Sequence, residues 1–195
     1  MNFDFAQQIN PSLKKLDFPK ALAIAETELT KIPTTEFHAV LSHSFIKQAD
    51  SLAIWVDNFH QAISKKMNIK ALYFEMNEFD INTDTWYIDG FAYDKDGGLN
   101  LDDMEWLCDF TRDEMTTEEF VLTGFEKIQR AFESIQLDND NLQNSRDWCE
   151  QIVISRFMEL MRTAHLKAKE KNLAWATIPI YFTEHSYDFI LKSDN

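Results

Sequence analysis

The spacing of apolar residues changes twice along this chain, and that change limits the folds it can adopt. In the first third, apolar side chains such as Leu52 and Val56 recur every three to four positions, which predicts helices. Residues 70–78 and 85–93 are instead aromatic and β-favouring, and in each segment apolar side chains at every second position share one face, which predicts two strands. Helical spacing then returns, until the apolar segment 174–182 predicts a last strand.

This order of helices, strands, helices and strand predicts an α+β fold. We expect a small antiparallel sheet of three to four strands, packed with an N-terminal helical region and two C-terminal helices. The chain of 195 residues suits a single domain, residues 1–195. Within it we expect a helical part at about 1–67, an acidic strand region at about 68–115, and C-terminal helices with the last strand at about 116–195.

Three local segments carry more specific expectations. A second helix is expected after Pro33, up to about Phe45, because Thr residues that can cap a helix follow the proline. The segment 104–110 fits a third strand better than a short helix. Thr116 and Glu119 form a capping-box pattern, which predicts the start of a helix there.

The negative charge is concentrated in one part of the chain. Residues 67–120 carry three Lys/Arg and fifteen Asp/Glu, a net charge of −12 out of −14 for the whole chain. Such a block predicts a surface that meets a positively charged protein partner, with solubility as the simpler alternative. It argues against nucleic acid and anionic membranes as direct partners, because both are bound through Lys and Arg.

Aromatic side chains lie between the acids of this block, a pattern typical of protein–protein interfaces. If Trp86 and Ile88 point into the core, the alternation of a strand directs Tyr87 and Asp89 outward. The alternative is that helices cover both faces of the sheet. The predicted partner-binding residues are Glu78, Asp80, Asp84, Tyr87, Asp89, Phe91, Tyr93, Asp94, Asp96, Asp102, Asp103 and Glu105.

Chemical motifs are weak in this sequence. The acids between 94 and 105 partly match a calcium-binding loop, but Gly98 and Leu99 stand where an acid and the required glycine belong. Glu75 and Asp89 on neighbouring strands look like a glycosidase pair, a signal of little specificity in so acidic a segment. We therefore expect no catalytic residue, no metal and no cofactor. The alternative is a small enzyme or a calcium-regulated module that uses the acidic loop 94–105.

The remaining signals concern compartment and single residues. The N-terminal sequence shows no basic start followed by an apolar run, so no signal peptide is visible. Cys108 and Cys149 have a spacing that fits no metal or redox motif. These observations predict a cytoplasmic protein with two reduced thiols. Of the five histidines only His185, beside a predicted strand end, stands out, and a structural hydrogen bond is its expected role.

The segment 71–98, ALYFEMNEFDINTDTWYIDGFAYDKDGG, resembles the aromatic strand pairs of immunity proteins from bacterial polymorphic toxin systems, including contact-dependent growth inhibition. The likeness extends to residues 122–129 and 174–190 and covers under a third of the chain. The resemblance implies a non-enzymatic protein that binds a toxin domain tightly, often a basic nuclease. Such a protein blocks the toxin's active site or holds the toxin inactive, and the resemblance carries over no catalytic residue.

Overall fold

The computed structural model describes residues 3–187 and 189–194 of the chain. Its α-helices are α1 (Phe3–Leu13), α2 (Phe18–Thr30), α3 (Ala49–Ile63), α4 (Glu126–Ser134) and α5 (Asp140–Glu170). Its strands are β1 (Ala71–Met76), β2 (Trp86–Tyr93), β3 (Phe120–Leu122), β4 (Ile180–Glu184) and β5 (Leu191–Ser193). Short 3₁₀-helices occur at η1 (Glu36–Ser42), η2 (Ile46–Gln48), η3 (Glu105–Cys108), η4 (Arg112–Glu114) and η5 (Ala174–Thr177).

The strands form one mixed sheet in the order β3-β2-β1-β4-β5. All neighbouring pairs are antiparallel except β1 and β4, which run parallel. The predicted α+β class is confirmed, but the expected antiparallel sheet of three to four strands is wrong, because the described residues form five strands and one pair of them is parallel. The C-terminal part also holds η5 besides the two helices expected. The parallel pair arises because the chain passes through α5 before β4 enters beside β1, and parallel strands need such a crossover.

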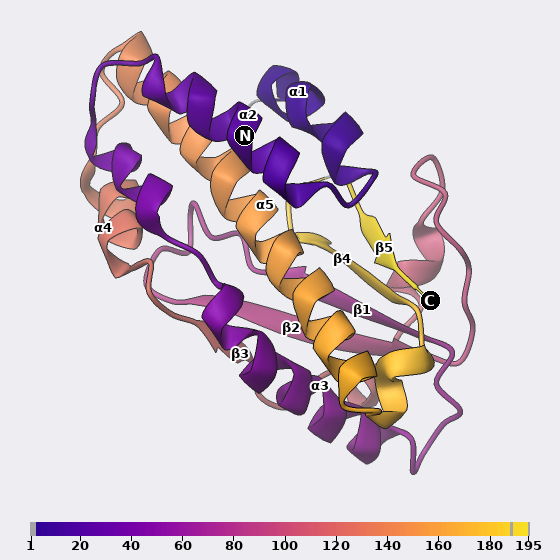
Figure 1. Ribbon diagram of the computed structural model, residues 1–195. Coiled ribbons are helices and arrows are strands. Elements are labelled where there is room, and N and C mark those ends of the chain that lie inside the picture. The colour runs from indigo at the N-terminus through magenta and orange to yellow at the C-terminus, as the bar shows by residue number, and fades with distance from the viewer. Residues whose placement is uncertain (1–2, 188, 195) are drawn as a thin grey trace.

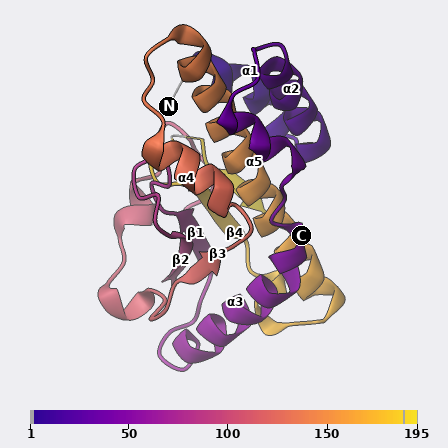
Figure 2. The same ribbon diagram turned by 90° about the vertical axis from the view of Figure 1, so that its left-hand side faces the viewer.

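Helices cover one face of the sheet. α1, α2, α3 and α5 gather there, with the 31-residue α5 running across the sheet (Figure 1). The segment 94–116, which contains η3 and η4, lies on the opposite side (Figure 2). The alternative of two helix-covered faces is therefore wrong. In the described part of the chain no helix is both long enough and apolar enough to cross a membrane.

The inner face of the sheet follows the predicted alternation. Leu72 and Phe74 of β1 and Trp86 and Ile88 of β2 are buried in the core against the helices. Aromatic packing extends this core beyond the sheet, where the rings of Phe125 and Phe45 stack at 4.0 Å and lie beside Trp86. Burial of large aromatic rings contributes much of the stability of such a core.

The segment expected to form a second α-helix instead forms η1 and η2. The Thr35 N–H donates to His38 Nδ1 at 3.1 Å, and His38 Nε2 lies 2.9 Å from the Leu29 carbonyl oxygen. Phe37 and Val40 are both fully buried. Their separation of three residues matches the turn of a 3₁₀-helix, so tertiary anchoring decides this local conformation.

The segment 104–110 contains η3 (Glu105–Cys108) and does not form a third strand. A strand would direct Trp106 and Leu107 to opposite sides, but both pack against the same aromatic cluster on the sheet. A hydrogen bond from Trp106 Nε1 to the Gly98 carbonyl oxygen, 3.1 Å long, holds this turn in place.

The capping-box pattern at Thr116 and Glu119 does not begin a helix. Residues Phe120–Leu122 form β3 on the edge of β2, and α4 begins only at Glu126. Gly124 separates the two elements with a φ of 91°, a conformation that favours glycine. The first residues of the predicted helix thus form a strand, because they pair with β2.

Candidate functional site

The outer face of the sheet, away from the helices, carries the polar residues of β1 and β2. Trp86 and Ile88 face the core, so the alternation of β2 directs Tyr87 and Asp89 outward as predicted. Glu75 lies directly opposite Asp89 on β1. The outer face therefore carries acidic side chains from both central strands.

One half of the outer face is covered. The segment 94–116, called here the covering loop, crosses it and buries Phe91 and Tyr93. The Trp106 ring packs edge-on against Tyr93 and Tyr181 at centroid distances of 5.0 and 5.1 Å. The Tyr93 hydroxyl donates to the Leu107 carbonyl oxygen at 2.6 Å. Phe91 and Tyr93 point outward as predicted, but they serve as the floor for this loop.

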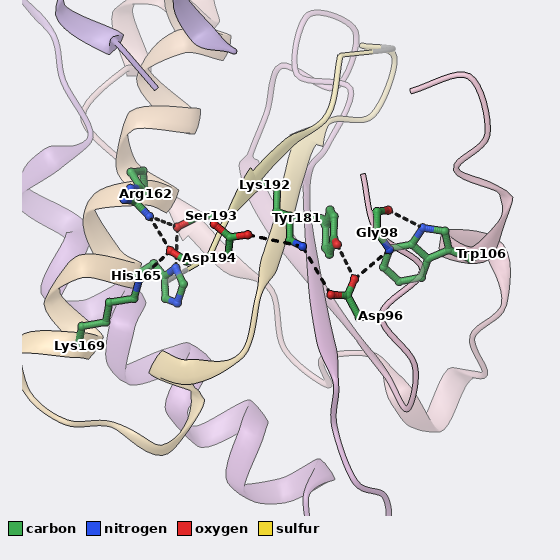
Figure 3. A network of polar contacts seen from close by, with 10 residues as sticks. All are labelled: Asp96, Gly98, Trp106, Arg162, His165, Lys169, Tyr181, Lys192, Ser193 and Asp194. Atoms are coloured by element: carbon green, nitrogen blue, oxygen red, sulfur yellow. Dashed lines mark hydrogen bonds and ion pairs between the residues drawn. The ribbon is translucent and has the colours of Figure 1, made fainter. Parts of the chain in front are cut away.

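Asp96 anchors the start of the covering loop. Its carboxylate accepts hydrogen bonds from the Tyr181 hydroxyl at 2.5 Å and from the Gly98 N–H at 3.0 Å, and it lies 3.5 Å from Lys192 Nζ (Figure 3). The Tyr181 and Gly98 hydrogen bonds and the Lys192 charge, acting against burial, lower the pKa of Asp96. Asp96, one of the predicted partner-binding residues, thus has a structural role in this fold.

The same network continues to α5 and fixes β5. The side chains of His165 and Ser193 are fully buried, with His165 Nδ1 2.6 Å from Ser193 Oγ and Arg162 donating to that oxygen (Figure 3). His165 Nε2 lies 3.1 Å from the Ala176 carbonyl oxygen. Burial places this serine–histidine pair out of reach of a substrate, so it acts as a tether for the last strand.

The uncovered half of the outer face contains a hollow of about 240 Å³. This acidic hollow is lined by Glu75, Asn77, Glu78, Asn82, Tyr87, Asp89 and His185. Asn77 shapes its floor, because its side chain accepts from the Tyr87 N–H at 2.9 Å and donates to the Thr85 carbonyl oxygen at 3.2 Å.

Carboxylates dominate the electrostatics of the acidic hollow. Glu75 accepts hydrogen bonds from the Tyr73 hydroxyl at 2.5 Å and from His185 Nδ1 at 2.7 Å, and the latter raises the pKa of His185. Partial burial, then the charges of Glu119 and Glu75, raise the pKa of Asp89. The hollow therefore concentrates negative charge that a cationic group would stabilise.

The structure distributes the predicted site residues over two areas. Glu78, Tyr87 and Asp89 line the acidic hollow. Asp94, Asp102, Asp103 and Glu105 are exposed on the covering loop. Asp84 is exposed in the turn between β1 and β2, whereas Asp80 of the same turn is half-buried and pairs with Arg146 at 3.1 Å.

Few of the acids in the segment 67–120 are neutralised. Among the described residues, ion pairs from Lys or Arg reach three of the fifteen: Asp80 from Arg146, Asp96 from Lys192 and Asp109 from Lys95. Glu75 has His185 as its neighbour. The other acids lack such a partner in the described part of the chain, so the negative charge of the segment remains largely uncompensated.

The geometry gives little support to the alternative of a small enzyme or a calcium-regulated module at residues 94–105. Asp96, the second acid of the calcium-like pattern, is bound internally to Tyr181 and Lys192. No cluster of three or more His, Cys, Asp or Glu side chains within the described residues could hold a metal ion. Cys108 is exposed, Cys149 is buried, and both are free thiols.

Sequence reasoning left several residues of this face out of the predicted site. Glu75 and His185 are not among the predicted partner-binding residues, and they meet only because β4 lies beside β1. Glu119 lies near enough for its charge to raise the pKa of Asp89. It does so because the residues after Glu119 form β3 beside β2 and not the expected helix. Alternation along β1 alone would have placed Glu75 on the outer face.

Comparisons of this chain with protein-family models, with curated proteins and with solved structures found no match.

Proposed function

We propose that this chain is a non-enzymatic binding protein that neutralises a basic partner domain, as the immunity proteins of bacterial toxin systems do. The acidic surface used for docking consists of the acidic hollow and the exposed acids of the covering loop. The observation that carries the proposal is that most carboxylates of the segment 67–120 have no Lys or Arg partner among the described residues.

The physical basis is electrostatic complementarity. A nuclease domain must attract phosphate, so its working surface is positive. An inhibitor with uncompensated carboxylates is steered toward such a surface, which raises association rates by about 10- to 1000-fold at low salt. We place the complex in the cytoplasm, where a toxin made in the same cell has to be captured quickly.

The covering loop suits this function because it is fixed in advance. Trp106 and Asp96 hold it on the sheet through ring packing and hydrogen bonds. Exposed acids on such a loop lose little conformational freedom when a partner binds, which favours affinity.

The test uses a basic domain encoded in the reading frame next to this gene as the partner. We expect its association rate to fall steeply between low and high salt. Reversal of four exposed charges, at Asp94, Asp102, Asp103 and Glu105, should slow association at low salt at least tenfold.

The matched control reverses four exposed acids outside the segment 67–120: Glu36, Glu133, Asp138 and Glu170. This control changes the net charge by the same amount, so general charge effects appear in both variants. The proposal fails if the two variants associate at the same rate, or if no basic domain binds the unaltered chain.

A further inference from the structure

The outer edge of β5 presents free backbone groups. The Leu72 N–H donates to the Pro179 carbonyl oxygen at 3.1 Å, and the His185 N–H donates to that of Met76 at 2.9 Å. In β4 the odd-numbered residues therefore bond to β1, and the even-numbered residues face β5. Their partners on β5 are Leu191 and Ser193, so the N–H and C=O of Lys192 point away from the sheet.

Within the described residues, neither of these Lys192 backbone groups has a hydrogen-bond partner. The other edge of the sheet is bridged by side chains on either side of β3. Beside β3, the Gln48 side chain bonds to both the N–H and the C=O of Thr123, and Trp55 Nε1 donates to the Glu118 carbonyl oxygen at 3.2 Å. These bonds lie on residues that flank β3, whereas the N–H and C=O of Val121 within β3 point outward without a partner among the described residues. Both edges therefore offer main-chain groups for pairing, and the two edges differ in what lies beside them.

A groove of about 360 Å³ runs along the β5 edge. Residues 189–192 form its floor, Lys14 and Leu16 form one wall, and residues 99–102 of the covering loop form the other. Figure 1 shows β5 between the turn that joins α1 to α2 and the covering loop. Leu99 and Leu101 are 42 % and 43 % exposed, which is high for leucines beside a groove.

The charges of the groove narrow the choice of occupant. Lys14 on one wall and Asp102 on the other form no ion pair within the described structure. The Lys192 ammonium is occupied by Asp96 and Asp194. A complementary segment would place an acidic side chain toward Lys14, a basic side chain toward Asp102 and apolar side chains against the two leucines.

We propose that this groove binds an extended segment of a partner protein, which adds to β5 as a sixth strand. Main-chain hydrogen bonds to Lys192 would supply affinity, and the leucine wall and the two charges would supply specificity. The β5 groove is distinct from the acidic hollow but shares Asp102 with the exposed acids of the covering loop. The Lys192 variants keep those acids, so they test this proposal separately from the toxin-neutralising function.

The experiment selects binders from a phage-displayed library of random octapeptides and uses the best one as a synthetic probe. We expect the selected peptides to alternate apolar residues and to carry one basic and one acidic side chain. Binding should protect the Lys192 amide from hydrogen exchange in the unaltered chain.

Lys192→Pro removes the backbone N–H, and Lys192→Ala is its matched control, because both lose the same ammonium group. Proline is tolerated on edge strands, and circular dichroism checks that both variants fold. The peptide should bind Lys192→Pro at least fivefold more weakly than Lys192→Ala.

Asp102→Lys provides a variant that leaves the backbone intact, and it should weaken binding of peptides with a basic residue. The proposal is overturned if no extended peptide is selected, if the Lys192 amide gains no protection, or if both Lys192 variants bind equally. Concentration-dependent dimers that Lys192→Pro abolishes would overturn it too, since a second copy would then be the occupant.

Discussion

Glu75 of β1 and Asp89 of β2 occupy directly opposed positions, and both side chains line the same uncovered hollow of the sheet. Like charges opposite each other on neighbouring strands destabilise a sheet. A fold under selection for stability alone would replace one of them, so the pair is consistent with a binding role for this face.

Replacing Asp89 with asparagine should therefore stabilise the protein. Asp89→Asn removes the repulsion from Glu75 and Glu119, and we expect the free energy of unfolding at pH 7 to rise by up to about 1 kcal/mol. Urea denaturation measures this change. Asp84→Asn, at an exposed turn position, is the control and should change stability little. A loss of stability in Asp89→Asn would show that Asp89 supports the fold.

Glu184 should make the protein lose stability as pH rises from 4.5 to about 8. Its side chain is fully buried, and burial raises its pKa to about 8 from an ordinary 4.5. Between these two values the folded state holds a proton that the unfolded state has lost, so stability falls as pH rises, by up to about 1.4 kcal/mol per pH unit. Glu184→Gln should flatten this decline in melting temperature between pH 5 and pH 8, and an identical pH profile for both proteins would contradict the assignment.

His165 should make the protein less stable as pH falls into the acidic range. Burial lowers its pKa to about 4 from 6.5. As pH falls below 6.5 the unfolded chain takes up a proton that the folded chain excludes, so stability is lost until pH falls through about 4. His165→Gln should show a weaker acid dependence of the melting temperature than the unaltered chain. His43, the half-buried residue that follows η1, provides a control for the loss of an imidazole ring: His43→Gln should still show the acid dependence that His165 causes.

The sequence predicted those elements whose local pattern agrees with their final packing. Residues 71–76 and 86–93 are rich in aromatic and β-favouring side chains, and both form strands with the expected inner residues. The prediction was wrong where contacts between distant segments determine the local secondary structure. Trp106 is drawn onto Tyr93 and Tyr181, which replaces an expected strand with η3.

The candidate site was only partly predictable for the same reason. Tyr87 and Asp89 follow from alternation along a single strand. His185 joins Glu75 across 110 positions of sequence, and no local signal specifies that β4 pairs with β1 in parallel. Burial of Phe91 and Tyr93 depends likewise on a loop whose path is set by distant partners, so their exposure could not be judged from the strand alone.

Gly97 should control the order of the covering loop. A Cβ atom at this position would lie 2.4 Å from Trp106 Cγ, and the ring cannot move away because Tyr93 and Tyr181 pack against it. We expect Gly97→Ala to cost about 1–3 kcal/mol of stability and to speed hydrogen exchange of residues 94–110. Gly98→Asn is the matched control, since no atom lies within 4 Å of its Cβ position and asparagine tolerates its φ of 78°. If the loop presents a preorganised acidic surface, Gly97→Ala should also weaken partner binding at unchanged net charge, whereas unchanged exchange rates would mean that Trp106 does not hold the loop.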